Sequence, residues 1–336
     1  MLATRFTTLV GCAVPVQQAG MGAGAPPELA AAVSNAGGLG MIGAAINGLN
    51  VTTLAERLDR AQALTDRPFG VNFIITEPVA PSDYALYELA ARRARVVELF
   101  LYAPPDRRLF DLIHLHGALV SCQVGSRDEA VAAAKAGCDL IVAQSFEAGG
   151  HVRGTLGMLA LLDEVLDAID VPVLAAGGVG SGRALAAVLA AGADGARVGT
   201  RFVAAVESAV HPVYRQALID ADARDSVYTE SFSVGWPHAP HRVLRSCIAA
   251  ATAFEGEIIG QKERMDGQLV PWLRFGVGVP TRASTGTIEA MPMWAGESVG
   301  AVKRTEPAAA ILAELVTEAE RLLTRFSPSP ANAVSG

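Results

Sequence analysis

The chain has 336 residues, of which 51% are hydrophobic and 18% are charged, and its formal net charge at pH 7 is −7. This composition is typical of a globular protein with a large core and excludes a disordered chain. The acidic balance argues against nucleic-acid binding, and no apolar run reaches the ~20 residues that a membrane-spanning helix needs. Four scattered cysteines without a C-x-x-C pair are expected to stay reduced, which indicates a cytoplasmic protein.

The first two hundred residues are predicted to alternate strands and helices. A first strand is expected within residues 1–20, where a short apolar stretch precedes Pro15 and two glutamines. Three later segments each contain an Ala-rich helix, an Ala-Gly stop and a short apolar strand, since glycine commonly follows the last turn of a helix. These segments are Leu29–Ile42, Glu129–Val142 and Ala184–Val198.

Four further apolar runs are predicted as strands. Several are apolar throughout instead of alternating, which is typical of a parallel sheet with both faces covered. A (β/α)8 TIM barrel is the simplest architecture, and a doubly wound open sheet is the alternative that periodicity does not separate from it. The four runs are Phe69–Ile75, Val96–Leu101, Ala118–Gln123 and Val171–Ala176.

Beyond residue 208 the sequence is richer in charged and aromatic residues. We predict an α/β barrel formed by residues 1–208 and 284–336, with a mainly helical cap, residues 209–283, inserted as a substrate domain. Glu207 and Ser208 are expected to be structural, with a capping role. The elements expected in this half are helices near 212–222 and 243–255, a loop over 280–294, an amphipathic helix over 306–326 and a frayed tail over 327–336.

Two consecutive strand–helix units within residues 171–202 end their strands in glycine directly before a helix. These glycines are Gly177 and Gly178 in the first unit and Gly199 in the second. Neighbouring loops at the carboxyl ends of barrel strands lie side by side, and N–H groups at helix starts bind phosphate where glycine lets it approach. The alternative is that the glycines only form turns, but the paired arrangement favours a phosphate site.

Another glycine pattern, GMGAGA at residues 20–25, fits the G-x-G-x-x-A motif of dinucleotide-binding proteins. That motif requires an acidic residue at the end of the next strand. The strand predicted there contains only apolar residues and glycine, so a Rossmann site is disfavoured.

A histidine follows two glycines in the loop after a further predicted strand, Asp139–Ala143. The segment AQSFEAGGH places Gly149, Gly150 and His151 at the face that carries the phosphate loops. The glycines let a flat ring lie against the backbone, and a histidine over that ring suits proton transfer or anion binding. A lone loop histidine is usually only structural, but its position beside a phosphate site favours a catalytic role. A ring site and a phosphate site on one face together suggest FMN.

Seven segments carry a resemblance to a known family, in matching order and over nearly the whole chain. They are VPVQQAGM (14–21), AAAVSNAGGLGMIG (30–43), RPFGVN (67–72), AQSFEAGGH (143–151), VPVLAAGGV (171–179), VGTRFVAAVESAVHPVYRQAL (198–218) and MWAGESVGAV (293–302). Through them the chain resembles the nitronate monooxygenases (formerly 2-nitropropane dioxygenases), a family that also includes FMN-dependent enoyl-ACP reductases. The resemblance implies a barrel that binds FMN non-covalently.

The resemblance also implies which residues contact the cofactor. Asn72 would offer its amide to the carbonyl and N–H edge of the flavin, and Gly178, Gly199 and Thr200 would cradle the phosphate. His151 would lie near the flavin N5, as an acid/base or as the group that orients an anionic substrate. The implied cofactor-binding set is Gly20, Met21, Asn72, Gln144, Gly149, Gly178, Arg197, Val198, Gly199, Thr200, Gly296 and Ser298, with His151 catalytic and no metal ligand.

Some positions depart from the family pattern, and others carry a motif without a role in it. Glu297 stands where the family usually has Gln, the loop after His151 is one residue longer, and segment 231–246 differs from the commoner pattern. These differences lie where substrate would enter, so they leave specificity open. His238 and His241 form an H-x-x-H pair, but the prolines beside them argue against a helical metal site.

The first functional hypothesis is an FMN-dependent nitronate monooxygenase that oxidises alkyl nitronates with O2 to carbonyl compounds and nitrite. The alternative is an NAD(P)H-dependent FMN reductase of enoyl thioesters or quinones, in which Arg153, Arg242 and Arg245 would bind the nucleotide. A third is a flavin- or phosphate-binding protein without catalysis, against which His151 argues. The expected partners are a small-molecule substrate and O2, with NAD(P)H in the alternative, and a homodimer is the assembly considered.

Overall fold

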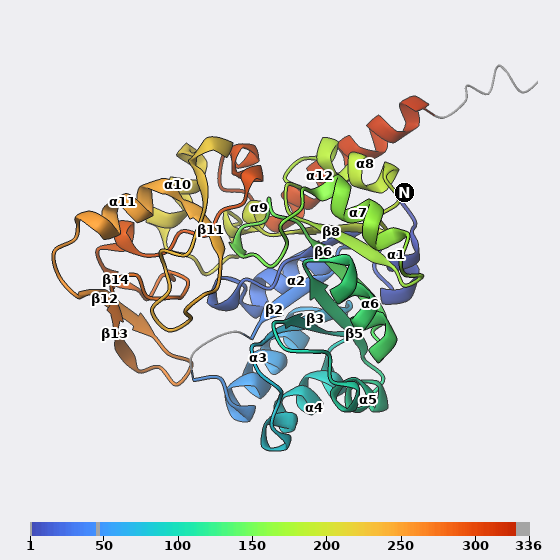
Figure 1. The fold of residues 1–336 in the computed structure, drawn as a ribbon, viewed down its shortest axis with the longest axis horizontal. Coiled ribbons are helices and arrows are strands. Elements are labelled where there is room, and N and C mark those ends of the chain that lie inside the picture. The colour runs from blue at the N-terminus through green and yellow to red at the C-terminus, as the bar shows by residue number, and fades with distance from the viewer. Residues whose placement is uncertain (1, 45–47, 327–336) are drawn as a thin grey trace, which may run out of the picture.

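Eight parallel strands form one sheet in the computed structural model, which describes residues 2–44 and 48–326 (Figure 1). The strands are β1 (Val16–Gln18), β2 (Gly40–Gly43), β3 (Phe69–Ile75), β4 (Val96–Leu101), β5 (Leu119–Val124), β6 (Leu140–Gln144), β8 (Val173–Ala176) and β9 (Gly195–Val198). Their order is β1-β9-β8-β6-β5-β4-β3-β2. Hydrogen bonds from Gln18 N to Leu39 O and from Leu39 N to Val16 O close the sheet into a barrel. The predicted TIM barrel is confirmed, and the open doubly wound alternative is wrong.

Helices cover the outside of this barrel, as the alternating sequence pattern predicts. After β9 the chain passes through the cap before α12 packs against α8 and α2 and completes the ring. The glycines of the three predicted Ala-Gly stops, Gly37, Gly137 and Gly192, have φ of 99°, 102° and 101°, the left-handed conformation that ends a helix. The helices are α2 (Pro27–Asn35), α3 (Val51–Leu64), α4 (Tyr84–Arg93), α5 (Arg107–Leu115), α6 (Arg127–Ala136), α7 (Met158–Leu166), α8 (Gly182–Ala190) and α12 (Ala308–Leu323).

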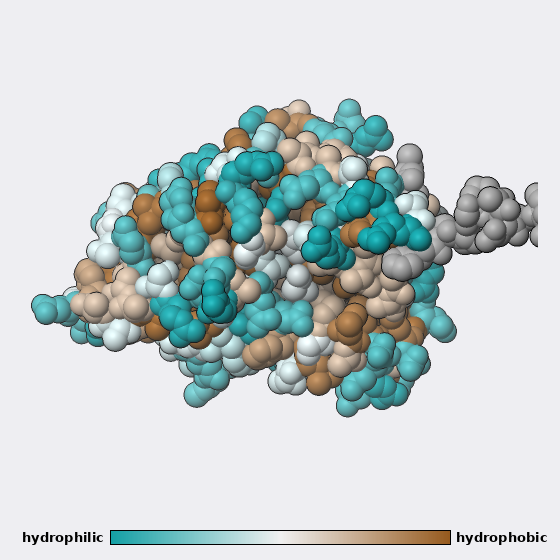
Figure 2. Space-filling view, turned by 90° about the horizontal axis from the view of Figure 1, so that it is seen from above, coloured by the Kyte–Doolittle hydropathy of each residue, from teal (hydrophilic) through white to brown (hydrophobic). Residues whose placement is uncertain are grey.

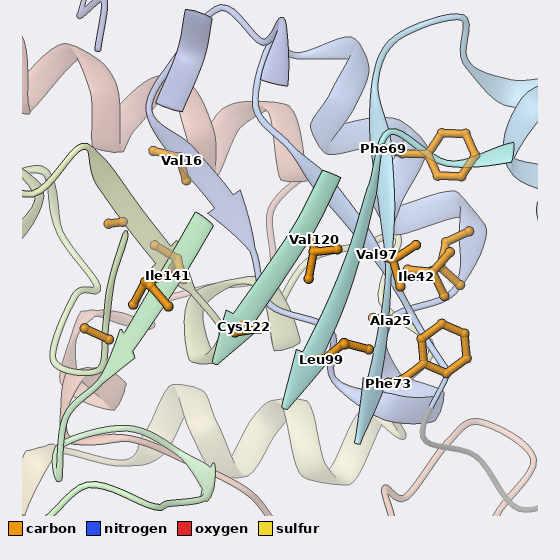
Figure 3. Packing of buried hydrophobic residues seen from close by; sticks show 14 of the residues in the cluster. Val16, Ala25, Ile42, Phe69, Phe73, Val97, Leu99, Val120, Cys122 and Ile141 are labelled. Carbon is orange, nitrogen blue, oxygen red and sulfur yellow. The ribbon is translucent and has the colours of Figure 1, made fainter. Parts of the chain in front are cut away.

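Side chains alternate between the two faces of each barrel strand. Outward residues such as Val97, Leu99 and Val120 belong to the main hydrophobic cluster between sheet and helices (Figure 3). The predicted strands at 69–75 and 96–101 match β3 and β4 residue for residue, because both runs are buried along their length. The tail expected to fray, residues 327–336, lies outside the described residues.

The amino-terminal end of the barrel is closed by a helix that the sequence analysis did not predict. Helix α1 (Arg5–Val10) precedes β1, and its Phe6 and Val10 pack with Met41 and Val96 inside the barrel. The first strand expected within residues 1–20 is present, but only over three residues. The short apolar stretch before it forms the helix, with Thr4 as its N-cap.

The insertion after β9 contains small sheets as well as helices. The expected helices are present as α10 and α11, but the three-stranded sheets β10-β11-β7 and β13-β12-β14 were not predicted, so the segment is mixed instead of mainly helical. The cap boundaries at 209 and 283 stay a proposal. These elements are β7 (Gly150–His151), α9 (Thr200–Val203), α10 (Pro212–Asp220), β10 (Ser226–Thr229), β11 (His241–Leu244), α11 (Arg245–Ala253), β12 (Ile258–Glu263), β13 (Leu269–Leu273) and β14 (Thr285–Gly286). Short 3-10 turns are η1 (Gly22–Gly24), η2 (Pro81–Asp83), η3 (Ala223–Asp225), η4 (Ile288–Ala290), η5 (Glu297–Ala301) and η6 (Thr324–Phe326).

Strand pairing is among the contacts that join the cap to the barrel. Strand β7, which follows β6 in the barrel, pairs antiparallel with β11 of the cap. At the return, the carboxylate of Glu207 accepts a hydrogen bond of 2.9 Å from Ala308 N at the start of α12, which confirms its predicted capping role. The face shown in Figure 2 is mostly hydrophilic, with small hydrophobic areas between. Within the described ranges, no helix is long and apolar enough to cross a membrane.

Candidate active site

The residues predicted from the sequence gather at the carboxyl ends of the barrel strands. Asn72 and Gln144 lie on β3 and β6, while Gly149 and Gly178 lie in the loops that follow β6 and β8. The remaining predicted positions are Gly20 and Met21 after β1, Arg197 and Val198 at the end of β9, Gly199 and Thr200 at the start of α9, and Gly296 and Ser298 where the cap returns.

The Gly-Gly-His loop and the returning cap segment pack directly against each other. A Cβ at Gly149 would lie 2.5 Å from Gly296 N, so only glycine permits this approach. Gly296 N donates a 3.1 Å hydrogen bond to the Thr200 hydroxyl, and Glu297 N donates one of 3.0 Å to Glu147 O. Gly149 therefore has a structural reason to be glycine, and its predicted contact with a flavin stays a prediction.

The paired glycine loops have the properties of a phosphate site. The N–H groups of residues 177–180 and 199–200 have no acceptor among the described residues. Gly178 has φ of 71°, a conformation that side chains strain, and α8 starts directly beyond with Ser181 as its N-cap. Because β8 and β9 are neighbours, free donors from both loops face one region. These donors fit the phosphate of FMN.

His151 lies in an aromatic cluster at the mouth of the barrel. Its ring stacks on Trp236 with centroids 4.0 Å apart, and the ring centroids of Trp294 and His241 are 5.2 Å and 5.6 Å away. Its Nε2 atom is buried and has no hydrogen-bond partner in the described structure. Burial lowers the pKa of His151 to about 3, and the neighbouring His241 adds to the shift. The imidazole is therefore neutral at physiological pH.

Gln144 holds the backbone on both sides of this histidine. Its side-chain N–H donates to His151 O at 2.8 Å, and its carbonyl oxygen accepts from Arg153 N at 3.1 Å. Both ends of the amide are thus used within the protein. The extra residue after His151 is accommodated here, since Val152 N continues the pairing by donating to Pro240 O.

Below the mouth, polar side chains from five strands form a buried network inside the barrel. Glu98 accepts hydrogen bonds from Asn72 (2.8 Å) and Gln17 (2.6 Å) and pairs with Arg197 at 2.8 Å, while Arg197 also donates to Gln123. Burial lowers the pKa of the Arg197 guanidinium, and Glu98 opposes the shift. Arg197 and Val198 were predicted among the flavin contacts. The Arg197 side chain lies in this network and Val198 packs in the outer core, and their contact with a flavin stays a prediction.

Two atoms of the network lack partners. Arg197 Nε and Gln17 Oε1 are buried and have no hydrogen-bond partner in the part of the chain that the structure describes. The two residues are directly opposite each other in the β1–β9 pairing. A donor and an acceptor on paired residues are thus left unsatisfied inside the barrel, where an ordered water or a ligand would satisfy them.

The arginines considered for nucleotide binding are mostly committed to other groups. Arg153 pairs with Glu129 and lies over the Tyr102 ring, 4.7 Å from its centroid. Arg242 is buried, pairs with Glu297 at 3.1 Å and donates to Phe146 O. Arg245, by contrast, is exposed and donates only one long hydrogen bond, of 3.5 Å, to Arg224 O.

The H-x-x-H pair does not form a metal site. His241 is fully buried, with Nδ1–H donating to Ala239 O at 2.9 Å and Nε2 accepting from Phe232 N at 3.2 Å, and burial lowers its pKa. His238 is exposed in a turn with φ of 56°. No group of three or more potential metal ligands occurs within the described residues.

Sequence reasoning missed the network and the aromatic cluster. Glu98 in VVELFL, Gln17 and Gln123 are polar residues inside apolar strands, and this pattern could have indicated a buried polar network. Trp236 and Trp294 gave no comparable signal, because Trp236 lies between two cap strands that were not predicted and Trp294 lies in a segment expected to be a loop.

Comparisons with known proteins agree with this geometry. A family model described as nitronate monooxygenase matches residues 3–318. A (3aS,4S,5R,7aS)-5-hydroxy-7a-methyl-1-oxo-octahydro-1H-indene-4-carboxyl-CoA dehydrogenase of Rhodococcus jostii is 36% identical over 259 residues, 77% of this chain and 70% of that protein. FabK from Thermotoga maritima is similar in structure, with a TM-score of 0.79, 29% identity and coverage of 97% of this chain and 99% of that one. A nitroalkane oxidase from Streptomyces ansochromogenes gives a TM-score of 0.73 at 28% identity, covering 96% and 99%.

Proposed function

This chain belongs to the nitronate monooxygenase family, and we propose on that premise that it is an FMN-dependent enzyme that oxidises alkyl nitronates with O2 to carbonyl compounds and nitrite. The family match and the relatives support an oxidoreductase of a flavoprotein family. The nitronate substrate is inferred from the family's name and from the similarity to a nitroalkane oxidase.

The residues present fit FMN. The N–H groups of residues 177–180 and 199–200, which have no acceptor among the described residues, would hold the phosphate, and Asn72, the middle residue of β3, would meet the ring. FMN, when bound, supplies the electron transfer that protein side chains lack. The protein would supply the pocket, the orientation of the substrate and the control of protons.

The single observation that carries the proposal is the state of His151. It is neutral, its Nε2 is buried without a partner, and Trp236 stacks on its ring. A neutral imidazole in dry surroundings orients a nitronate oxygen by a hydrogen bond instead of an ion pair, which is strong where water is excluded. In this role Nε2 carries the proton and donates the hydrogen bond, because the oxygens of a nitronate only accept.

A second candidate is a reductase or dehydrogenase of acyl thioesters that uses NAD(P)H. The observation that favours it is the 36% identity to a carboxyl-CoA dehydrogenase. The apolar, neutral surroundings of His151 suit an uncharged acyl group as well as a small nitronate. Of the three arginines considered for the nucleotide, Arg245 is the exposed one.

The experiment that separates the two candidates is anaerobic stopped-flow on the purified, FMN-loaded protein, following the flavin absorbance. Propyl-2-nitronate is mixed in one series and NADH or NADPH in the other. Rapid bleaching by the nitronate with little response to either nucleotide supports the oxygenase. Rapid bleaching by a nucleotide alone overturns it in favour of the reductase. A protein that cannot be loaded with FMN overturns both.

A further inference from the structure

The amide of Asn72 can be oriented from its hydrogen bonds. Its Nδ2 lies 2.8 Å from Glu98 Oε1, and an ionised carboxylate only accepts hydrogen bonds, so the Asn72 NH2 group faces Glu98. Its Oδ1 accepts no hydrogen bond from the described residues. A Cβ at Gly20 would lie 2.7 Å from this oxygen. The carbonyl therefore faces the Gly20–Met21 segment, and glycine there leaves it open.

Glu98 itself is held in one place by several donors. Gln17 donates to its Oε2 at 2.6 Å, and Arg197 reaches its Oε1 at 2.8 Å from β9, on the opposite side of the barrel. The carboxylate is fully buried. Charge-assisted contacts of this kind are short and directional, so they fix the acceptor that Asn72 meets. Among the described residues, Glu98 is the acceptor that meets the Asn72 NH2 group, so its loss would allow the amide to turn over.

We propose that Glu98 is a positioning residue, which fixes the Asn72 amide so that its carbonyl oxygen recognises a ring N–H of the bound flavin. This rests on the proposed binding of FMN. The ring system of oxidised FMN carries one N–H, on its pyrimidine ring between two carbonyl groups. An acceptor matches that N–H, whereas a turned-over amide would present an NH2 group to it and leave the pair unsatisfied.

The test compares FMN with 3-methyl-FMN, in which a methyl group replaces that N–H, by reconstituting the full chain and following the quenching of flavin fluorescence. The wild type is expected to bind 3-methyl-FMN at least about tenfold more weakly than FMN, the effect of one buried hydrogen bond. Asn72→Ala and Glu98→Ala are expected to reduce this discrimination to about twofold. Glu98→Gln retains an acceptor at Oε1 and is expected to keep most of it.

Two further variants separate positioning from folding. Gln123→Ala is the matched control, because Gln123 contacts Arg197 and not Asn72, and it should leave the discrimination unchanged. If Glu98→Ala does not fold, Glu98→Met/Arg197→Met removes both charges together and should still lose the discrimination. Equal weakening of both flavins in the Glu98 variants would mean a merely structural role and overturn the proposal. If the wild type binds FMN and 3-methyl-FMN equally well, the role of Glu98 is overturned and the proposed function stands. If the wild type binds no FMN, the proposed function is overturned as well.

Discussion

The network inside the barrel and the aromatic cluster at its mouth lie one above the other but use polar groups in opposite ways. In the network, the charges of Glu98 and Arg197 are buried together and bind each other, although Arg197 Nε and Gln17 Oε1 have no partner among the described residues. In the cluster, His151 is neutral and keeps a buried nitrogen without a partner. Paired charge fixes positions, whereas an unsatisfied neutral group is available to a ligand. The network therefore supports the site, and the cluster is where chemistry is expected.

The largest expected effect breaks the network. Arg197→Met leaves the Glu98 carboxylate buried without its cation and should lower the free energy of unfolding by about 3–5 kcal/mol. Glu98→Met/Arg197→Met should recover most of this loss, since the desolvated charge is gone. Urea denaturation followed by circular dichroism measures both. A loss below about 1 kcal/mol in the single variant would show that the pair is not a structural unit.

The next largest effect is expected from a substitution in the aromatic cluster that leaves the network unchanged. His151→Asn should lower turnover of propyl-2-nitronate at least about a hundredfold, because the buried hydrogen-bonding nitrogen is removed. The free energy of unfolding should fall only by the worth of the stacking on Trp236, about 0.5–1.5 kcal/mol, since the nitrogen itself has no partner to lose among the described residues. Steady-state oxygen consumption measures the turnover, and urea denaturation measures the free energy of unfolding. Turnover within tenfold of the wild type would remove His151 from the mechanism.

The dependence of stability on pH tests the difference between the neutral His151 and the paired charges of the network. Burial lowers the pKa of His151 to about 3 from an ordinary value of 6.5, so on acidification the unfolded chain takes up the proton first. Stability should therefore fall as the pH drops from 6.5 towards 3, by up to about 1.4 kcal/mol per pH unit, and be unaffected by this group above 6.5. His151→Asn should flatten the slope. His241, whose pKa burial also lowers, contributes to what remains, as do the carboxylates of Glu28, Glu88 and Asp222, whose pKa values are lowered too.

The smallest expected effect concerns the stacking on His151. Trp236→Ala should let water reach the imidazole, so the pKa of His151 should rise towards its ordinary value, as histidine NMR titration would measure. Loss of the ring contact should cost about 1 kcal/mol or less. Trp236→Phe keeps an aromatic face and should leave the pKa close to that of the wild type. An unchanged pKa in Trp236→Ala would mean that other groups keep the site dry.

The sequence predicted the parts of this molecule that depend on local pattern. Strands β3 and β4 were located to the residue because their sequences are mostly apolar and almost fully buried, and the Ala-Gly stops ended helices where expected. The network could not be assembled in this way. Gln17 and Glu98 are 81 residues apart, and their contact exists only once the barrel has closed. The stacking of Trp236 on His151 likewise depends on strand pairing between cap and barrel.

That pairing between β7 and β11 has a consequence for engineering. In the sequence, His151 lies among the barrel elements. Its backbone, however, belongs to β7, which pairs with β11 of the cap and places His241 directly opposite. A chimera that exchanges the cap with a homologue would separate this histidine from the strand that holds it. Grafting a new specificity onto this scaffold therefore requires two cassettes, one spanning the inserted segment and one spanning residues 149–152, transplanted from the same donor.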